Sequence, residues 1–144
     1  MEIRARVANR PRHHEVQVST NGSTRSVPIA ARETGFGSSV NGGEFLALAL
    51  ATCYCNDLYR EATPRGIAIH SVEVEVIAAF GGLGEPAQAI RYRVAIAAAA
   101  PEETVRELAE HTDSVAEIHN TLRVGIPVRL EGVTVNSSPG PSGA

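Results

Sequence analysis

The chain has 144 residues and a net charge of −3, so it is long enough to fold as one domain with a substantial core. All 13 cationic side chains are arginine, and they are spread along the chain without a basic cluster, which argues against nucleic acid as the main partner. Because lysine is absent from the sequence, lysine Schiff bases, pyridoxal-phosphate attachment and the P-loop lysine are excluded. The N-terminus carries no apolar signal core, so we expect a cytoplasmic protein whose two cysteines are thiols.

The first part of the chain shows the two-residue alternation that is typical of half-buried β-strands. Apolar and polar residues alternate over residues 3–7 and again over residues 15–19, which predicts two strands. The Asn-Gly pair at 21–22 is a strong hairpin signal, so residues 23–29 are expected to return as a third strand. Pro28 indicates an edge position or the end of that strand, because proline has no N–H for a central ladder.

Residues 45–52 (FLALALAT) carry no charge and consist mainly of alanine and leucine. Both are strong helix formers, and the only β-branched residue is the last, so we predict a helix rather than a strand. A helix that is apolar around its whole circumference is typical of the middle of a fold. The stretch is too short to span a bilayer, which takes about 20 apolar residues. The sequence therefore predicts a buried central helix that ends near Thr63, because Pro64 and Gly66 follow.

The second half of the chain predicts a long hairpin followed by helices. The two-residue alternation returns over residues 67–80 and 90–96, on either side of a glycine-rich turn. Pro101 precedes two glutamates, which is a favourable helix start. Ser114 and Glu117 have the spacing of a capping box, so a second, short helix is expected to begin there.

The C-terminal pattern completes an α+β fold. Gly125 is expected to close the short helix, and alternation over residues 128–135 predicts a final strand. Residues 137–144, rich in serine, proline and glycine, are expected to be disordered. We therefore predict a single domain over residues 1–136, with antiparallel sheets around the buried central helix. A second copy would complete the burial of so apolar a helix, which favours a homodimer.

Cys53, in the second half of the predicted central helix, is the main candidate for chemistry. A buried cysteine is often an inert small hydrophobe, and reactivity requires a thiolate that is stabilised by a neighbouring group. Cys55 lies about 200° around the helix from Cys53, so a disulfide between them is geometrically unfavourable. The two cysteines have no second ligand pair at metal-binding spacing, so no metal is expected. The pair His13-His14 is interpreted as solvated surface.

The segment GGEFLALALATC (residues 42–53) resembles the OsmC/Ohr family of osmotically inducible and organic hydroperoxide resistance proteins. In that family a cysteine follows a small-residue run on a helix that opens with a proline or glycine and an acid. The segment NTLRVGIPVRLE (residues 120–131) is similar to the C-terminal pattern of the family. The order of strands and helices also matches, so the resemblance covers most of residues 1–136.

The resemblance implies an intertwined homodimer that reduces organic hydroperoxides through a cysteine, without metal or cofactor. By position, Cys53 takes the role of the peroxidatic cysteine, which attacks the peroxide and becomes a sulfenic acid. The family holds the thiolate with an arginine from the region before the helix, and Arg32 is the nearest candidate, followed by Arg25. Glu44 matches the acidic position of one branch of the family, with helix capping as the alternative role.

The sequence departs from the family at the resolving cysteine. A gapless count places Ala116 at that position, and a shifted alignment places Asp113 there. The resemblance then implies a one-cysteine peroxidase that an external thiol reduces. Two alternatives stay open: a non-catalytic relative that binds a hydrophobic small molecule at the dimer interface, and another thiol reaction with His111 or His119 as base.

Overall fold

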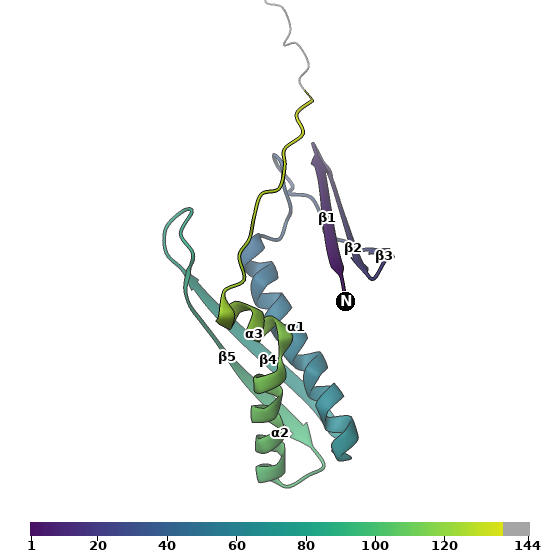
Figure 1. Cartoon of the computed structure of the whole chain (residues 1–144), viewed down its shortest axis with the longest axis vertical. Coiled ribbons are helices and arrows are strands. Elements are labelled where there is room, and N and C mark those ends of the chain that lie inside the picture. The colour runs from purple at the N-terminus through teal and green to yellow at the C-terminus, as the bar shows by residue number, and fades with distance from the viewer. Residues whose placement is uncertain (137–144) are drawn as a thin grey trace, which may run out of the picture.

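The structure of the chain, a computed structural model, describes residues 1–136. A three-stranded antiparallel sheet comes first, with strands β1 (Ile3–Arg10), β2 (His13–Thr20) and β3 (Ser23–Ser26) in that spatial order. The long helix α1 (Gly42–Ala62) follows, and then a two-stranded hairpin of β4 (Ile69–Phe80) and β5 (Ala87–Ala98). Helices α2 (Glu102–Val115) and α3 (Glu117–Val124) complete the helical part (Figure 1). The tail at residues 137–144, predicted to be disordered, lies outside the described residues.

The first hairpin forms at the predicted turn. Asn21 and Gly22 have φ values of 48° and 87°, the left-handed conformations that a tight two-residue hairpin needs. Strand β3 ends at Ser26, so the prediction of a strand over residues 23–29 was wrong in its second half. The N–H of Val27 still donates to the carbonyl of Val16, but Pro28 has no N–H with which to continue the ladder.

The start of α1 is fixed by a reciprocal cap. The side chain of Asn41 accepts from the N–H of Glu44 at 2.9 Å, and the Glu44 carboxylate accepts from the N–H of Asn41 at 2.7 Å. These two bonds satisfy backbone donors that a helix N-terminus leaves free. At the other end α1 passes into a 3₁₀ turn, Thr63–Arg65, which Gly66 closes at a φ of 65°. The predicted helix and its end near Thr63 are confirmed.

The core lies where the second half of α1 packs between the β4–β5 hairpin and α2. Tyr54, Leu58 and Ala62 of α1 form a fully buried cluster with Leu108 of α2. Apolar side chains on one face of the hairpin pack against this cluster: Val72, Val74, Tyr92, Val94 and Ile96. The alternating pattern of both strands thus turns one face to the core and the other to solvent. Within residues 1–136, no helix is long and apolar enough to cross a membrane.

The first half of α1 is covered less than the sequence predicts. Leu50 is 2% exposed, but Leu48 is 57% exposed. The expectation that the rest of the chain covers this helix was therefore wrong for Leu48 and Ala49, whereas residues 45–47 are half-buried. The cover of α1 comes from β4 of the hairpin and from the C-terminal helices, which Figure 1 shows beside it.

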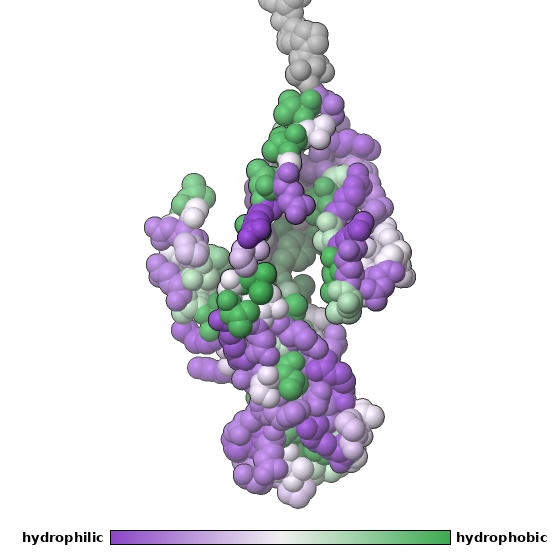
Figure 2. All heavy atoms as spheres, in the orientation of Figure 1, coloured by the Kyte–Doolittle hydropathy of each residue, from purple (hydrophilic) through white to green (hydrophobic). Residues whose placement is uncertain are grey.

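The C-terminal part differs from the prediction in two ways. Residues 126–136 are extended but pair with no strand in the described chain, so the predicted final strand at residues 128–135 was wrong. The side chains of Val128 and Leu130 are 99% and 83% exposed, and Figure 2 shows this apolar segment rising from the body of the molecule. The capping box of Ser114 was also wrong, because its hydroxyl donates to the carbonyl of His111. The predicted closure of α3 is confirmed by Gly125, at a φ of 65°.

Candidate active site

Three side chains on one face of α1 form the centre of the site. The thiol of Cys53 donates to Oδ2 of Asp57 over 3.3 Å. Nη1 of Arg60 donates to the other oxygen of Asp57, Oδ1, over 2.7 Å. The three residues lie at i, i+4 and i+7, which is the spacing of one helix face. Asp57 is 5% exposed, so its carboxyl group is held in a fixed position between thiol and guanidinium.

Helix α3 contributes the other side of the site. The backbone N–H of Ile118, in the first turn of α3, lies near the sulfur of Cys53 and lowers the pKa of the thiol. Glu117 is the first residue of α3, and its Oε1 accepts from Nη1 of Arg60 over 3.2 Å. Arg60 therefore joins two carboxylates, one from each helix, beside the thiol. The N-terminus of a helix is a favourable place for a developing negative charge on sulfur.

The surroundings of Cys53 nevertheless raise its pKa. Burial of the thiol is the largest cause, and the carboxylates of Asp57 and Glu117 add to it. The N–H of Ile118 acts in the opposite direction by stabilising the thiolate. The pKa of Asp57 is raised as well, mainly by burial, whereas a bond with its own backbone N–H lowers the pKa of Glu117.

The ligand atoms of Cys53, Asp57 and Glu117 lie within 4.8 Å of one another, a spacing at which three groups can share a cation. Arg60 already donates to both carboxylates and supplies the positive charge of the site. We therefore assign the acceptor oxygens to Arg60 rather than to a metal.

The other residues predicted for the site lie elsewhere in the single chain. Nε of Arg32 donates to the carbonyl of Ser38 over 3.2 Å, within the loop that precedes α1. Glu44 is engaged in the helix cap at Asn41, as the capping alternative proposed. Neither residue has a hydrogen bond or ion pair to Cys53 anywhere in residues 1–136.

The thiol of Cys55 lies in a different environment from that of Cys53. Cys55 lines a hollow of about 260 Å³ whose walls also include Val74 of β4 and Asn56 of α1. Both cysteines are free thiols. The prediction that the two thiols point to different sides of the helix agrees with these separate surroundings.

The two positions considered for a resolving cysteine are distinguished by their contacts. Ala116 is fully buried and directly precedes Glu117 and Ile118, the residues of α3 nearest to Cys53. Asp113 instead accepts hydrogen bonds from the hydroxyl of Tyr92 and from the guanidinium of Arg123. The place of Ala116 in the chain, next to two residues that act on the Cys53 thiol, therefore favours the gapless alignment, which puts Ala116 at the resolving position.

Neither histidine that was considered as a base hydrogen-bonds to Cys53 within residues 1–136. Nε2 of His111 lies 2.9 Å from Oε2 of Glu61, which ties α2 to the end of α1. His119 is buried, with its ring centroid 4.9 Å from that of Tyr92. Among the described residues its two ring nitrogens have no hydrogen-bond partner, and burial lowers its pKa. His119 is thus a neutral core residue at neutral pH.

Asp57, Arg60 and Glu117 were not predicted from the sequence as site residues. For Asp57 and Arg60 a signal exists, because both share a helix face with Cys53 by simple spacing. For Glu117 no local signal exists, because it lies far from Cys53 in the chain and reaches the site through the packing of α3 against α1.

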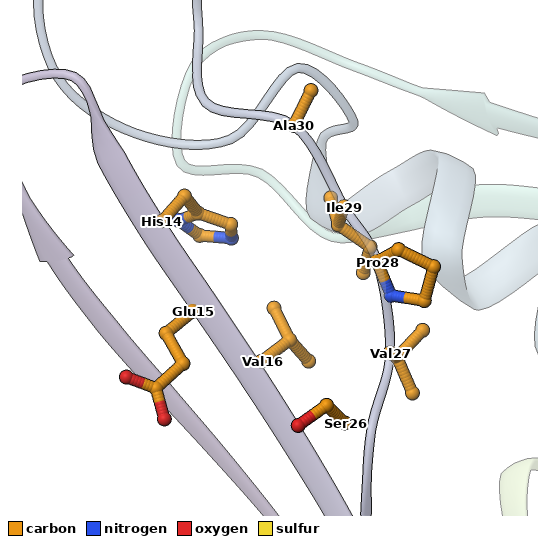
Figure 3. A pocket seen from close by; sticks show the side chains of 8 residues that line it. All are labelled: His14, Glu15, Val16, Ser26, Val27, Pro28, Ile29 and Ala30. Atoms are coloured by element: carbon orange, nitrogen blue, oxygen red, sulfur yellow. The ribbon is translucent and has the colours of Figure 1, made fainter.

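A separate hollow of about 560 Å³ lies between β2 and the segment that follows β3 (Figure 3). The side chains of His14 and Val16 point toward that segment, whereas Glu15 points away from it. The segment contributes apolar side chains, including Val27 and Ile29. His14 is half-buried here, so the interpretation of His13-His14 as a solvated pair was wrong for His14.

Comparison with known proteins relates this architecture to one family. Residues 35–131 match the family model described as OsmC-like protein. No curated protein matches the chain. Among solved structures, an OsmC-like protein from Mycoplasma pneumoniae is 17% identical with a TM-score of 0.60, over 85% of this chain and 89% of that one. An OsmC-like protein of unknown function from Vibrio cholerae is 14% identical with a TM-score of 0.56, over 84% and 93%.

A third structure is an organic hydroperoxide resistance protein OsmC from Legionella pneumophila, with 17% identity, a TM-score of 0.52 and coverage of 85% and 90%. At these identities the three structures share the fold with this chain, and the predicted α+β architecture with antiparallel sheets is confirmed. The matched residues 35–131 include α1, the long hairpin, α2 and α3, and thus every residue of the Cys53 site. The chain belongs to the OsmC-like family.

Proposed function

We propose that the protein reduces organic hydroperoxides through Cys53 as its one peroxidatic cysteine. The observation that carries this proposal is the placement of the Cys53 thiol between a carboxyl group, Asp57, and the first turn of α3. The sulfur thus has a proton acceptor on one side and a backbone N–H for negative charge on the other. Relatives of the same fold carry names that refer to organic hydroperoxide resistance, which supports this substrate class.

The proposed reaction transfers one oxygen atom to sulfur. Cys53 attacks the terminal oxygen of the hydroperoxide, the O–O bond breaks, and the leaving alkoxide takes up a proton to become an alcohol. Cys53 is left as a sulfenic acid. A first external thiol then forms a mixed disulfide with Cys53 and releases water, and a second thiol reduces it to regenerate Cys53.

An external thiol is required because the position favoured for a resolving cysteine holds Ala116. Cys55 faces a separate hollow and is a poor substitute. We propose a small cytoplasmic thiol as the reductant.

A second candidate function is the binding of a hydrophobic small molecule. The hollow between β2 and the segment after β3 supports it, because its walls are mostly apolar at Val16, Val27, Pro28 and Ile29. The hollow contains no residue of the Cys53 cluster, so the two functions are separable by mutation.

Dimedone labelling tests the peroxidase proposal. After treatment with an alkyl hydroperoxide, Cys53 should be trapped by dimedone as a sulfenic acid, and excess peroxide should oxidise it further to sulfinic acid. Cys53→Ser should abolish the label, and Cys55→Ser should keep it near the wild-type level. If Cys53 stays unlabelled at peroxide concentrations that modify a free thiol, it is a core residue. The peroxidase proposal is then rejected in favour of the binding of a hydrophobic small molecule.

A further inference from the structure

The two oxygens of Asp57 have different partners, and this fixes how its carboxyl group faces Cys53. Oδ1 accepts from Arg60 over 2.7 Å, and Oδ2 accepts from the thiol over 3.3 Å. The side chain is almost fully buried, so Oδ2 is kept on the sulfur instead of turning toward solvent. A carboxyl group held in contact with a thiol is placed to exchange a proton with it.

The charges around Asp57 come from two helices. Arg60 and the thiol of Cys53 face it from α1, and Glu117 faces it from α3, with His119 more distant on the same helix. Burial is the largest influence on the pKa of Asp57 and raises it, and Glu117 adds to this effect. The hydrogen bond from Cys53 and the charge of Arg60 lower that pKa. The contact between Oδ2 and the thiol places a proton acceptor against the S–H group of Cys53.

We propose that Asp57 is a catalytic residue that carries the proton of Cys53 to the leaving oxygen, an inference that rests on the hydroperoxide reduction proposed above. As sulfur attacks the terminal oxygen, the S–H proton passes to Oδ2 of Asp57. The S–O bond forms while the O–O bond breaks, and Asp57 returns the proton to the alkoxide to release the alcohol. Cys53 is oxidised to sulfenic acid, the hydroperoxide is reduced, and Asp57 ends in its starting state.

Arg60 and Glu117 are positioning residues in this scheme. Arg60 holds Oδ1 of Asp57 and thereby orients Oδ2 toward the sulfur, and Glu117 holds the guanidinium from the other helix. Neither forms a hydrogen bond with the sulfur within residues 1–136. Arg60→Lys should retain part of the rate, because an ammonium group also donates to Oδ1, although with less fixed geometry.

Asp57→Asn separates two effects of Asp57 on the reactivity of Cys53. Loss of proton transfer should slow the reaction with hydroperoxide, whereas loss of the negative charge should favour the thiolate. Asp57 disfavours the thiolate of Cys53, so the substitution should leave alkylation by iodoacetamide at neutral pH equal to wild type or faster. Alkylation needs a thiolate but no proton donor for an oxygen leaving group. Reaction with an alkyl hydroperoxide needs both, and should slow by about tenfold or more, since general acid–base catalysis contributes about 10²- to 10⁴-fold. Glu110→Gln, an exposed carboxylate-to-amide change on α2, is the matched control and should alter neither rate.

The outcomes distinguish this inference from the function on which it rests. If wild-type Cys53 reacts with hydroperoxide no faster than free cysteine, the proposed function fails and the role of Asp57 fails with it. If the wild type reacts quickly and Asp57→Asn reacts as fast or faster with both reagents, the function stands and the role of Asp57 is overturned. A measurement on the wild type covers the case of a misfolded variant. Both reactions share the change in thiol ionisation in D₂O, so the rate in D₂O relative to H₂O should fall further for hydroperoxide reduction than for alkylation. Equal ratios for the two reactions would also overturn the role of Asp57.

Discussion

At the scale of single residues, the environment of Cys53 differs from that of a cysteine activated by a cation in direct contact. Burial and two carboxylates oppose the thiolate, and the backbone N–H of Ile118 supports it. Arg60 donates to the carboxylates and so acts on the sulfur only through them. In such a site the raised pKa keeps the thiol protonated at neutral pH, and in the proposed reaction Asp57 accepts its proton during attack on the hydroperoxide.

Ala116→Cys tests whether the position of the missing resolving cysteine has been identified. Ala116 is buried at the junction of α2 and α3, directly before the residues that meet Cys53. We expect this variant to form a disulfide with Cys53 after one equivalent of hydroperoxide, seen as a cross-linked peptide by mass spectrometry. Asp113→Cys is the comparison variant for the shifted alignment. A disulfide to Cys53 in the Asp113→Cys variant, with none in the Ala116→Cys variant, would show that the shifted alignment is correct.

The sequence predicted residues whose role depends on local signals and missed those whose role depends on packing. Cys53 follows a small-residue helix, and the capping role of Glu44 was visible three positions from Asn41. The contact of α3 with Cys53 depends on how α2 turns at Ala116, where ψ is 108° and the helix is interrupted. The pattern around Ser114 predicted that a second helix begins there, and the structure places the break two residues later, at Ala116.

At the scale of elements, the end of α1 is tied to α2 through Glu61. Its carboxylate accepts from Arg65 and from Arg60, each over 3.1 Å, and lies 2.9 Å from Nε2 of His111. Arg65 is the largest cause of a pKa lowered from 4.5 to about 2, followed by Arg60. The cluster joins the last turn of α1, the following 3₁₀ turn and the middle of α2, and thus closes the core at its lower end in Figure 1.

Glu61→Gln should therefore lower the melting temperature in a pH-dependent way. A carboxylate with a lowered pKa in the folded state adds stability above its unfolded value of 4.5, and this stability is lost as the pH falls through about 2. The difference between wild type and variant should be largest at neutral pH and shrink between pH 4.5 and 2. Thermal unfolding followed by circular dichroism measures it, with Glu107→Gln on α2 as the control. If the difference in melting temperature between wild type and variant stays constant from pH 4.5 to pH 2, the ion pairs of Glu61 add no stability.

Strands and turns whose ends are marked by glycine in the sequence were predicted well. The strand that would need a neighbouring strand to pair with was not. The hairpin of β4 and β5 and the turn at 21–22 carry glycine and alternation that define them locally. Residues 128–135 show the same alternation, yet a strand forms only where a neighbouring edge offers hydrogen bonds. The described chain offers none to this segment.

At the scale of the whole molecule, apolar surface is concentrated where the single chain leaves elements unpartnered. Leu48 of α1 and the side chains of the extended segment at residues 126–136 are exposed together with Ile3 and Val7 of β1. Figure 2 shows apolar atoms along this segment and on the facing side of the three-stranded sheet. Extended backbone with free hydrogen-bonding groups next to exposed apolar side chains is typical of a surface that pairs with another chain.

We expect a homodimer in which a second copy covers Leu48 and pairs with the segment at residues 126–136. Sedimentation of the wild type at micromolar concentration should give the mass of two chains. The double variant Val128→Arg with Leu130→Arg should sediment as a monomer. Burying two unpaired guanidinium groups at an interface costs more free energy than burial of the surrounding apolar surface gains. Ala95→Arg is the matched control, since Ala95 lies opposite Glu73 on the charged outer face of the hairpin, and it should remain dimeric. A wild type that sediments as a stable monomer would refute the dimer and would mean that the exposed apolar segment has another partner.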